Sequence, residues 1–128
     1  MKRVVSFLII MLLAVGTACA ERVVLGAEQT KEYLPLLKGK RVALLSNHTG
    51  LIIQAKGDTI HTLDLLLQHG IQVTAIFSPE HGFRGTAREG EKVASSVDEK
   101  TGRPILSLYD GNSTRPSKES MATVDIVI

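Results

Sequence analysis

The stretch from Ser78 to Glu91 concentrates the side chains that could carry out chemistry. It reads SPEHGFRGTAREGE and sets acids, arginines and a histidine among three glycines. Glu80 follows an apolar run directly, and a partly apolar pocket there would raise the pKa of its carboxyl and suit it to act as a general acid. A solvated loop glutamate and a helix cap are the alternatives. Glu91 could supply a second carboxylate, although a surface salt-bridge partner is the commoner role for such a residue.

Histidines and arginines in or near this loop suggest two further kinds of site. His48 and His81 could bind a metal ion together with Glu80, because histidine and carboxylate are common zinc ligands. The four histidines show neither H-x-x-x-H nor H-E-x-x-H spacing, so we favour a polar cleft and assign no metal. Arg84 could hold a carboxylate in bidentate fashion. Arg115 could do the same, but a surface arginine is at least as common.

Nucleotide and nucleic-acid binding are disfavoured by the sequence. The glycines at 82, 85 and 90 have the wrong spacing for G-x-G-x-x-G, and no P-loop lysine follows them. No basic stripe interleaved with aromatic residues is present, which argues against a nucleic-acid partner. We therefore expect no cofactor. His61 and His69 fall at the two ends of an expected helix, and we treat both as structural.

The chemistry-bearing loops need a scaffold that brings them together. Apolar runs at 41–45, 71–77, 104–109 and 124–128 predict strands, and residues 60–69 predict a helix that Asp58 or Thr59 caps and Gly70 ends. We expect short helices before Gly39 and after Ser117, and loops at 51–57 and 92–103. Alternating strands and helices predict an α/β fold, a mostly parallel sheet with helices on both faces. Ligands bind at the carboxyl ends of such strands, where Asn47, Glu80 and Tyr109 would lie.

The first twenty residues predict a secretory signal peptide. Lys2 and Arg3 precede an apolar run of about a dozen residues, too short to span a bilayer, and 18–20 read Ala-Cys-Ala, a small-residue cleavage site. The mature chain would begin near Glu21, exported to the periplasm or the exterior. Cys19 would leave with the signal, or alternatively would carry a lipid anchor. Loss of Lys2 and Arg3 would bring the formal net charge from +2 to 0.

Several motifs together resemble one protein family. They are LKGKRVALLSNHTG at 37–50, FSPEHGFRG at 77–85, Gly-Glu at 90–91, TGRP at 101–104 and SLY at 107–109. The set resembles the secreted exo-β-N-acetylmuramidases of the NamZ type, long catalogued as a domain of unknown function, over about residues 34–128. The resemblance implies a Rossmann-like catalytic domain, joined in the family to a smaller second domain. Residues 21–128 would form its N-terminal part, which agrees with an uncapped apolar run at the end of the sequence.

The resemblance also implies an activity: release of N-acetylmuramic acid from the non-reducing ends of peptidoglycan fragments, as in cell wall recycling. Glu80 carries over as the catalytic residue of a glycoside hydrolase, and the lactyl carboxylate of the sugar would give Arg84 an anionic partner. Asn47, His81 and Arg84 carry over as cleft residues. We predict substrate-binding roles for these three and for their neighbours in the same loops: His48, Glu91 and Tyr109.

Two other functions remain open from the sequence. A non-catalytic periplasmic module could bind a sugar or a peptidoglycan fragment through the same polar loops. A metal-dependent hydrolase could use His48, Glu80 and His81, although the irregular spacing argues against it. Glycoside hydrolysis usually needs two carboxyl groups, and only Glu80 is a strong candidate, so the sequence does not predict the stereochemical outcome.

Overall fold

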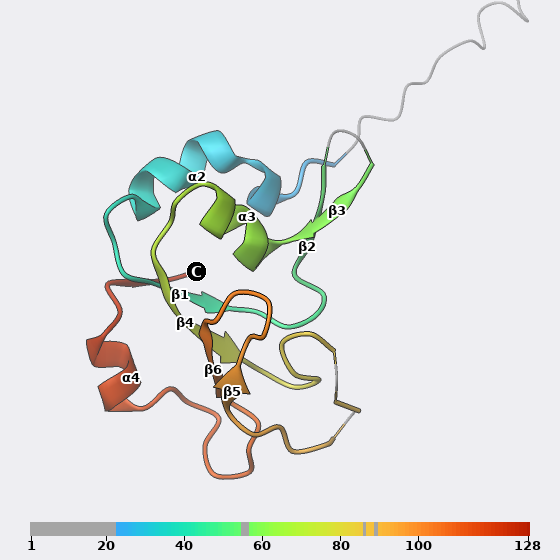
Figure 1. The fold of residues 1–128 in the computed structure, drawn as a ribbon, viewed down its shortest axis with the longest axis vertical. Coiled ribbons are helices and arrows are strands. Elements are labelled where there is room, and N and C mark those ends of the chain that lie inside the picture. Colours follow the sequence, from blue (N-terminus) through green and yellow to red (C-terminus); the bar gives the residue numbers. More distant parts are fainter. Residues whose placement is uncertain (1–22, 55–56, 86, 89) are drawn as a thin grey trace, which may run out of the picture.

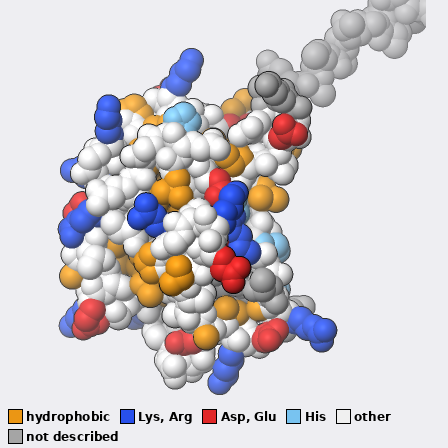
Figure 2. Space-filling view, in the orientation of Figure 1, with side chains coloured by type: hydrophobic (Ala, Val, Ile, Leu, Met, Phe, Trp, Pro, Cys, Tyr) orange, Lys and Arg blue, Asp and Glu red, His pale blue; other side chains and the backbone are white. Residues whose placement is uncertain are grey.

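The computed structural model describes residues 23–54, 57–85, 87–88 and 90–128 (Figure 1). The predicted signal peptide at 1–20, with Cys19, lies outside the described residues. Within the described ranges, no helix has the length and apolar character needed to cross a membrane. On the face that Figure 2 shows, acidic and basic side chains are interspersed, and neither sign of charge dominates a large area.

A five-stranded sheet forms the centre of the molecule and confirms the predicted α/β class. Its strand order is β5-β6-β4-β1-β7. Four strands run parallel: β1 (Val42–Leu45), β4 (Val73–Ser78), β6 (Pro104–Ser107) and β7 (Ile126–Val127). The chain steps from β1 to β4 to β6 and then returns to β7 on the other side of β1, which is the strand order of a Rossmann-like half.

One face of the sheet carries the larger hydrophobic core. The first helical segments, η1 (Gly26–Glu28) and α2 (Thr30–Leu37), precede β1, and α3 (Thr62–Gln68) connects β1 to β4. Figure 1 shows α2 and α3 together on one side of the strands. Leu37 of α2 and Leu63 and Leu66 of α3 are buried there against Val42 and Ile76 of the sheet. The strands are apolar on this face because the helices exclude water from it.

The opposite face is smaller. Ala43, Ala75 and Phe77 are buried on it, and Leu106, Leu108 and Val124 pack against them. Val124 follows α4 (Lys118–Ala122), which has no buried residue of its own. α4 follows Ser117 as predicted, and Ser117 caps it, since its side chain accepts a hydrogen bond from the Ser120 amide. Helical segments therefore adjoin both faces, but the α4 side contributes little to the core.

Residues 51–57 are not simply a loop, as the sequence had indicated. β2 (Leu51–Ile53) and β3 (Thr59–His61) pair antiparallel as a hairpin. Because Thr59–His61 pair with β2, α3 begins at Thr62, and the cap is His61 instead of Asp58 or Thr59. The predicted end of the helix is confirmed: Gly70 has φ +72° and its amide bonds to the Leu67 carbonyl.

The polar stretch at 92–103 also contains a strand that the sequence did not predict. β5 (Ser96–Val97) pairs antiparallel with β6, and its two residues are both exposed. A two-residue strand with no buried side chain has no alternation of apolar and polar positions. The sequence signal for a half-buried strand was therefore missing.

Candidate active site

The loops that follow β1 and β4 meet at the carboxyl edge of the sheet, as the parallel order requires. The rings of His48 and His81 lie edge to face, with centroids 5.7 Å apart. Gly85 lies against His48, so closely that a Cβ added to Gly85 would lie 3.0 Å from the Cβ of His48. The structure therefore brings the predicted residues His48 and His81 together.

Glu80 stands two residues beyond the end of β4 and is half-buried. Its Oε1 accepts a hydrogen bond of 2.9 Å from the backbone amide of Gly90. The partner is a loop amide, so Glu80 is not a helix cap. Its Oε2 accepts no hydrogen bond from the residues that the structure describes. One oxygen of the carboxylate is thus held in place, and the other is available to a ligand.

The backbone is strained immediately after Glu80. His81 has φ +71°, the left-handed region that side chains other than glycine avoid at a cost of about 1–2 kcal/mol. Its carbonyl accepts a hydrogen bond of 3.3 Å from the Ala87 amide, which helps to hold the turn. Such conformations persist where the surroundings over-determine them, and they cluster at functional sites.

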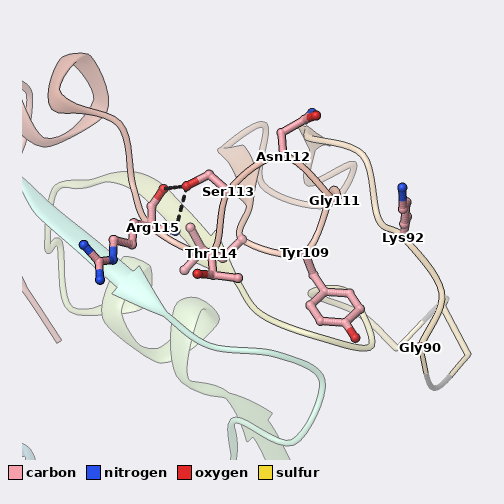
Figure 3. A pocket seen from close by; sticks show the side chains of 9 residues that line it. Gly90, Lys92, Tyr109, Gly111, Asn112, Ser113, Thr114 and Arg115 are labelled. Carbon is pink, nitrogen blue, oxygen red and sulfur yellow. Dashed lines mark hydrogen bonds between the residues drawn. The ribbon is translucent and has the colours of Figure 1, made fainter.

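A pocket of about 520 Å³ lies beside this loop (Figure 3). Gly90, the partner of Glu80, lines it together with Lys92, Tyr109 and the loop at 111–115. The Val93 amide bonds to the Tyr109 carbonyl at 3.0 Å and joins the two walls. In Figure 3 the Tyr109 ring points toward the segment that carries Gly90, whereas the Arg115 side chain points away from it. Tyr109 is thus placed to contact a ligand.

Arg84, predicted to bind an anionic ligand, is occupied by carboxylates of the protein itself. Its Nε and Nη2 each donate a 2.9 Å hydrogen bond to Asp98, and its Nη1 and Nη2 reach Asp64 at 3.5 and 3.4 Å. The guanidinium also lies 4.8 Å from the centroid of the Phe83 ring. These contacts give Arg84 a structural role, and its contact with substrate stays a prediction.

The contacts with Arg84 lower the pKa values of the Asp64 and Asp98 carboxyls. The hydrogen bonds from Arg84 are the main reason that the pKa of Asp98 lies below its usual value. Burial acts most strongly on Asp64 and would raise its pKa, but hydrogen bonds from Lys100 and Arg84 together outweigh burial and lower the pKa. The same contacts raise the pKa of Arg84, led by the hydrogen bonds to Asp98. All three groups are therefore charged at neutral pH.

His61 joins three parts of this edge of the sheet and is only 5% exposed. Its Nδ1 accepts a hydrogen bond of 3.2 Å from the Leu63 amide, and its Nε2 donates one of 2.9 Å to the Asn47 carbonyl. Its ring lies 4.6 Å from that of Phe83, centroid to centroid. Burial lowers the pKa of His61, so the ring is neutral, as a side chain that both donates and accepts must be.

Asn47 and Glu91, both predicted to bind substrate, make local contacts in the structure. Asn47 Oδ1 accepts hydrogen bonds from the amide and the hydroxyl of Thr49, which closes the turn after β1. The carboxylate of Glu91 accepts a 2.9 Å bond from the Arg88 amide and is exposed. These contacts are local to each loop, and the substrate-binding roles of Asn47 and Glu91 stay predictions.

The predicted residues do not assemble a metal site in the described part of the chain. No group of three or more histidine, cysteine, aspartate or glutamate side chains lies close enough there to hold an ion. His48 and His81 meet as packed rings.

Sequence reasoning missed the residues that hold the site together. Asp64 and Asp98 were not singled out, and His61 was treated only as a residue of a helix end. One signal was present for Asp64: it is an acidic residue inside the apolar run TLDLLLQ of α3. A carboxylate among buried leucines needs a cationic partner, and Arg84 and Lys100 supply it.

Comparison with known proteins shows close relatives of this chain. A curated protein of Bacillus subtilis (strain 168), "Peptidoglycan beta-N-acetylmuramidase NamZ", is 42% identical over 98 residues, which cover 76% of this chain and 22% of that protein. Two crystal structures of DUF1343 family proteins from Bacteroides fragilis NCTC 9343 superpose with TM-scores of 0.64 and 0.65. They are 48% and 34% identical and cover 84% and 80% of this chain, but only 25% and 24% of their own chains.

The chain thus spans about a quarter of the length of the relatives that it matches. The sequence model of one family, described as "Exo-beta-N-acetylmuramidase NamZ, N-terminal", matches residues 42–128. That range holds the whole sheet and each of the loops described above. Because the match covers more than half of the sequence, this chain belongs to the NamZ N-terminal family.

Proposed function

We propose that this chain forms the N-terminal part of an exported exo-β-N-acetylmuramidase, in which Glu80 is the general acid or base. Residues 21–128 would be the first part of its catalytic domain, after a signal peptide at 1–20. The substrate would be a peptidoglycan fragment with N-acetylmuramic acid at its non-reducing end. Membership of the NamZ family supports a glycoside hydrolase, and the name of the Bacillus subtilis relative gives the sugar.

The placement of Glu80 is the observation that carries the proposal. The carboxylate lies at the carboxyl edge of a Rossmann-like sheet, where such folds bind ligands. One oxygen is fixed by the Gly90 amide, and Gly90 itself lines the pocket that Tyr109 also lines. A general acid must be held within reach of the bond that it protonates. This geometry fixes one oxygen, and among the described residues none donates a hydrogen bond to the other.

The test requires a protein of family length, because glycoside hydrolysis usually takes two carboxyl groups and this chain offers one strong candidate. Residues 42–128 can replace the matched segment of the Bacillus subtilis relative. Release of the chromophore from a chromogenic β-N-acetylmuraminide is then measured for the chimera and for its Glu80→Gln variant. Glutamine preserves the size of the side chain and its ability to accept from Gly90, but it cannot transfer a proton.

We expect Glu80→Gln to lower kcat by at least about 100-fold, since general acid–base catalysis contributes about 10²–10⁴-fold. Glu99→Gln is the matched control, because Glu99 is an exposed carboxylate within the transplanted residues 42–128. The kcat of this variant should stay within about twofold of the parent. Equal activity of the parent and Glu80→Gln would remove the catalytic assignment. An inactive parent that still binds the muraminide would favour the non-catalytic binding module.

A further inference from the structure

We infer that Arg84 is a positioning residue for Glu80. With Asp64 and Asp98 it forms a three-residue clamp that holds the loop at 79–85 in place, and the substrate carboxylate is not its partner. The inference rests on the proposed function, because it assigns a role within the same site. It also makes a structural prediction that can be measured without any activity.

The clamp joins three segments that are distant in sequence. Arg84 belongs to the loop after β4, Asp64 to α3, and Asp98 to the turn after β5. The side chains of Asp64 and Asp98 are only 10% and 2% exposed, while that of Arg84 is 30% exposed. Both carboxylates are therefore withdrawn from solvent and depend on their partners within the protein. A buried carboxylate that loses its cation is strongly unfavourable, so Arg84 cannot easily leave for a ligand.

The carboxylates are themselves held in place. Asp98 Oδ2 accepts a 2.6 Å hydrogen bond from the hydroxyl of Thr101, and the Asp98 carbonyl accepts from the amides of Thr101 and Gly102. Asp64 Oδ2 accepts a 2.7 Å hydrogen bond from Lys100. Arg84 thus binds two carboxylates that other groups already hold in place. A side chain fixed in this way can orient its neighbours precisely.

The connection from the clamp to Glu80 is short. Phe83, next to Arg84, is 3% exposed and packs on the buried ring of His61. On the other side of Arg84, Gly85 lies against His48. Between Phe83 and Glu80 the backbone makes the left-handed turn at His81. With Phe83 and Arg84 both fixed, the turn has little freedom, and the Glu80 carboxylate is held where its Oε1 accepts from the amide of Gly90, a residue that lines the pocket.

The competing role, recognition of the lactyl carboxylate by Arg84, predicts different kinetics. A substrate-binding arginine acts mainly through KM. Asp98 does not line the pocket of Gly90 and Tyr109, so its replacement would then have no specific effect on kcat. A positioning role predicts a lower kcat with a nearly constant KM, and the same effect from either end of the Arg84–Asp98 pair.

Kinetics of the family-length chimera separate the two roles. For Arg84→Lys and Asp98→Asn we expect kcat to fall by about tenfold or more, with KM within about threefold. The double variant should be no slower than the slower single one, because both changes break the same contact. Arg84→Lys keeps the positive charge and loses only the planar fork, so it also covers the case in which Asp98→Asn fails to fold. A raised KM for Arg84→Lys with an unchanged kcat would overturn the inference.

The chain offers a matched control pair. Arg41 donates hydrogen bonds from its Nε and Nη2 to the carboxylate of Asp125. These side chains are far more exposed than those of the clamp, at 45% for Arg41 and 37% for Asp125. Asp125→Asn breaks an arginine–aspartate pair of similar geometry outside the loop, so we expect its kcat to stay at the parent value. An equal loss of kcat in Asp125→Asn and Asp98→Asn would show a general effect of stability and overturn the inference.

Hydrogen exchange on the 128-residue chain provides the readout that does not need activity. In Arg84→Lys, three hydrogen-bonded amides in or just after the loop, those of Gly85, Ala87 and Gly90, should exchange about tenfold faster or more. Amides of β1 and β4 should keep the parent rates. If Glu80→Gln proves fully active, the proposed function fails, but faster exchange confined to the loop would still support the clamp. Unchanged loop exchange would overturn it.

Discussion

Replacing His61 with alanine should lower the free energy of unfolding by about 3 kcal/mol. The helix cap formed by Nδ1 contributes about 1 kcal/mol. The hydrogen bond from Nε2 to the Asn47 carbonyl contributes about 1 kcal/mol net. The edge-on contact with Phe83 adds about 1 kcal/mol. His69→Ala is the control, because His69 is exposed at the other end of the same helix and should change stability by less than about 0.5 kcal/mol.

The pH dependence gives the same prediction a second test. Burial lowers the pKa of His61 in the folded protein, so the unfolded chain binds a proton that the folded one does not. The stability that neutral His61 provides is fully present above its ordinary pKa of about 6.5 and declines as the pH falls below it. The slope from this one proton can reach about 1.4 kcal/mol per pH unit. His61→Ala removes that part of the slope, so the two proteins should converge in stability as the pH falls.

Urea unfolding, followed by circular dichroism at pH 7.5, 6.5, 5.5 and 4.5, measures both quantities in one experiment. The difference between the parent and His61→Ala isolates this residue from all others that titrate. A destabilisation below about 1 kcal/mol at pH 7.5 would refute the count of three contacts. A difference that stays constant from pH 7.5 to 4.5 would refute the assignment of a buried, neutral ring.

Two further predictions concern the backbone and the edge of the sheet. Gly85→Ala should lower the free energy of unfolding by more than Gly39→Ala does: both residues have φ near +75°, which costs about 1–2 kcal/mol for alanine, but only Gly85 lies against His48. Comparing the urea midpoints of the two variants measures the His48 contact alone. Asp125→Asn should make the thermal midpoint less dependent on pH between about 4 and 2. The hydrogen bonds from Arg41 lower the pKa of Asp125 to about 2, and stability from a lowered carboxylate pKa is lost as the pH falls through that range. Equal pH dependence with and without Asp125 would contradict this.

The sequence predicted those elements in which local pattern and tertiary environment agree. The runs that became β1, β4 and β6 are apolar because the sheet is covered on both sides, and each was recognised. The β2–β3 hairpin was missed because only Ile52 of β2 is buried and the outer two residues of that strand are exposed. A strand of three residues has too little alternation to distinguish it from a loop.

For the candidate site, the sequence located the loops but not their internal contacts. The parallel order placed the loops of His48 and Glu80 at one edge, and the packing of His48 on His81 followed from that. The partners of Arg84 were not predictable, because Asp64 lies 20 residues before it and Asp98 14 residues after it. Only the folded chain shows that the charge of this arginine is already balanced within the protein.

The strand order has a consequence for how the chain folds. β1 pairs on one side with β4 and on the other with β7, and the bond from the Arg41 amide to Asp125 closes a separation of 84 residues. One of the two hydrogen-bonding edges of β1 therefore stays open until β7 arrives. An open apolar edge invites pairing with a second molecule. Closing so long a loop also slows folding, because its entropy is lost before the contacts form. During synthesis from the N-terminus, β1 emerges before β7 can pair with it, so this edge of β1 is exposed to other chains in the meantime.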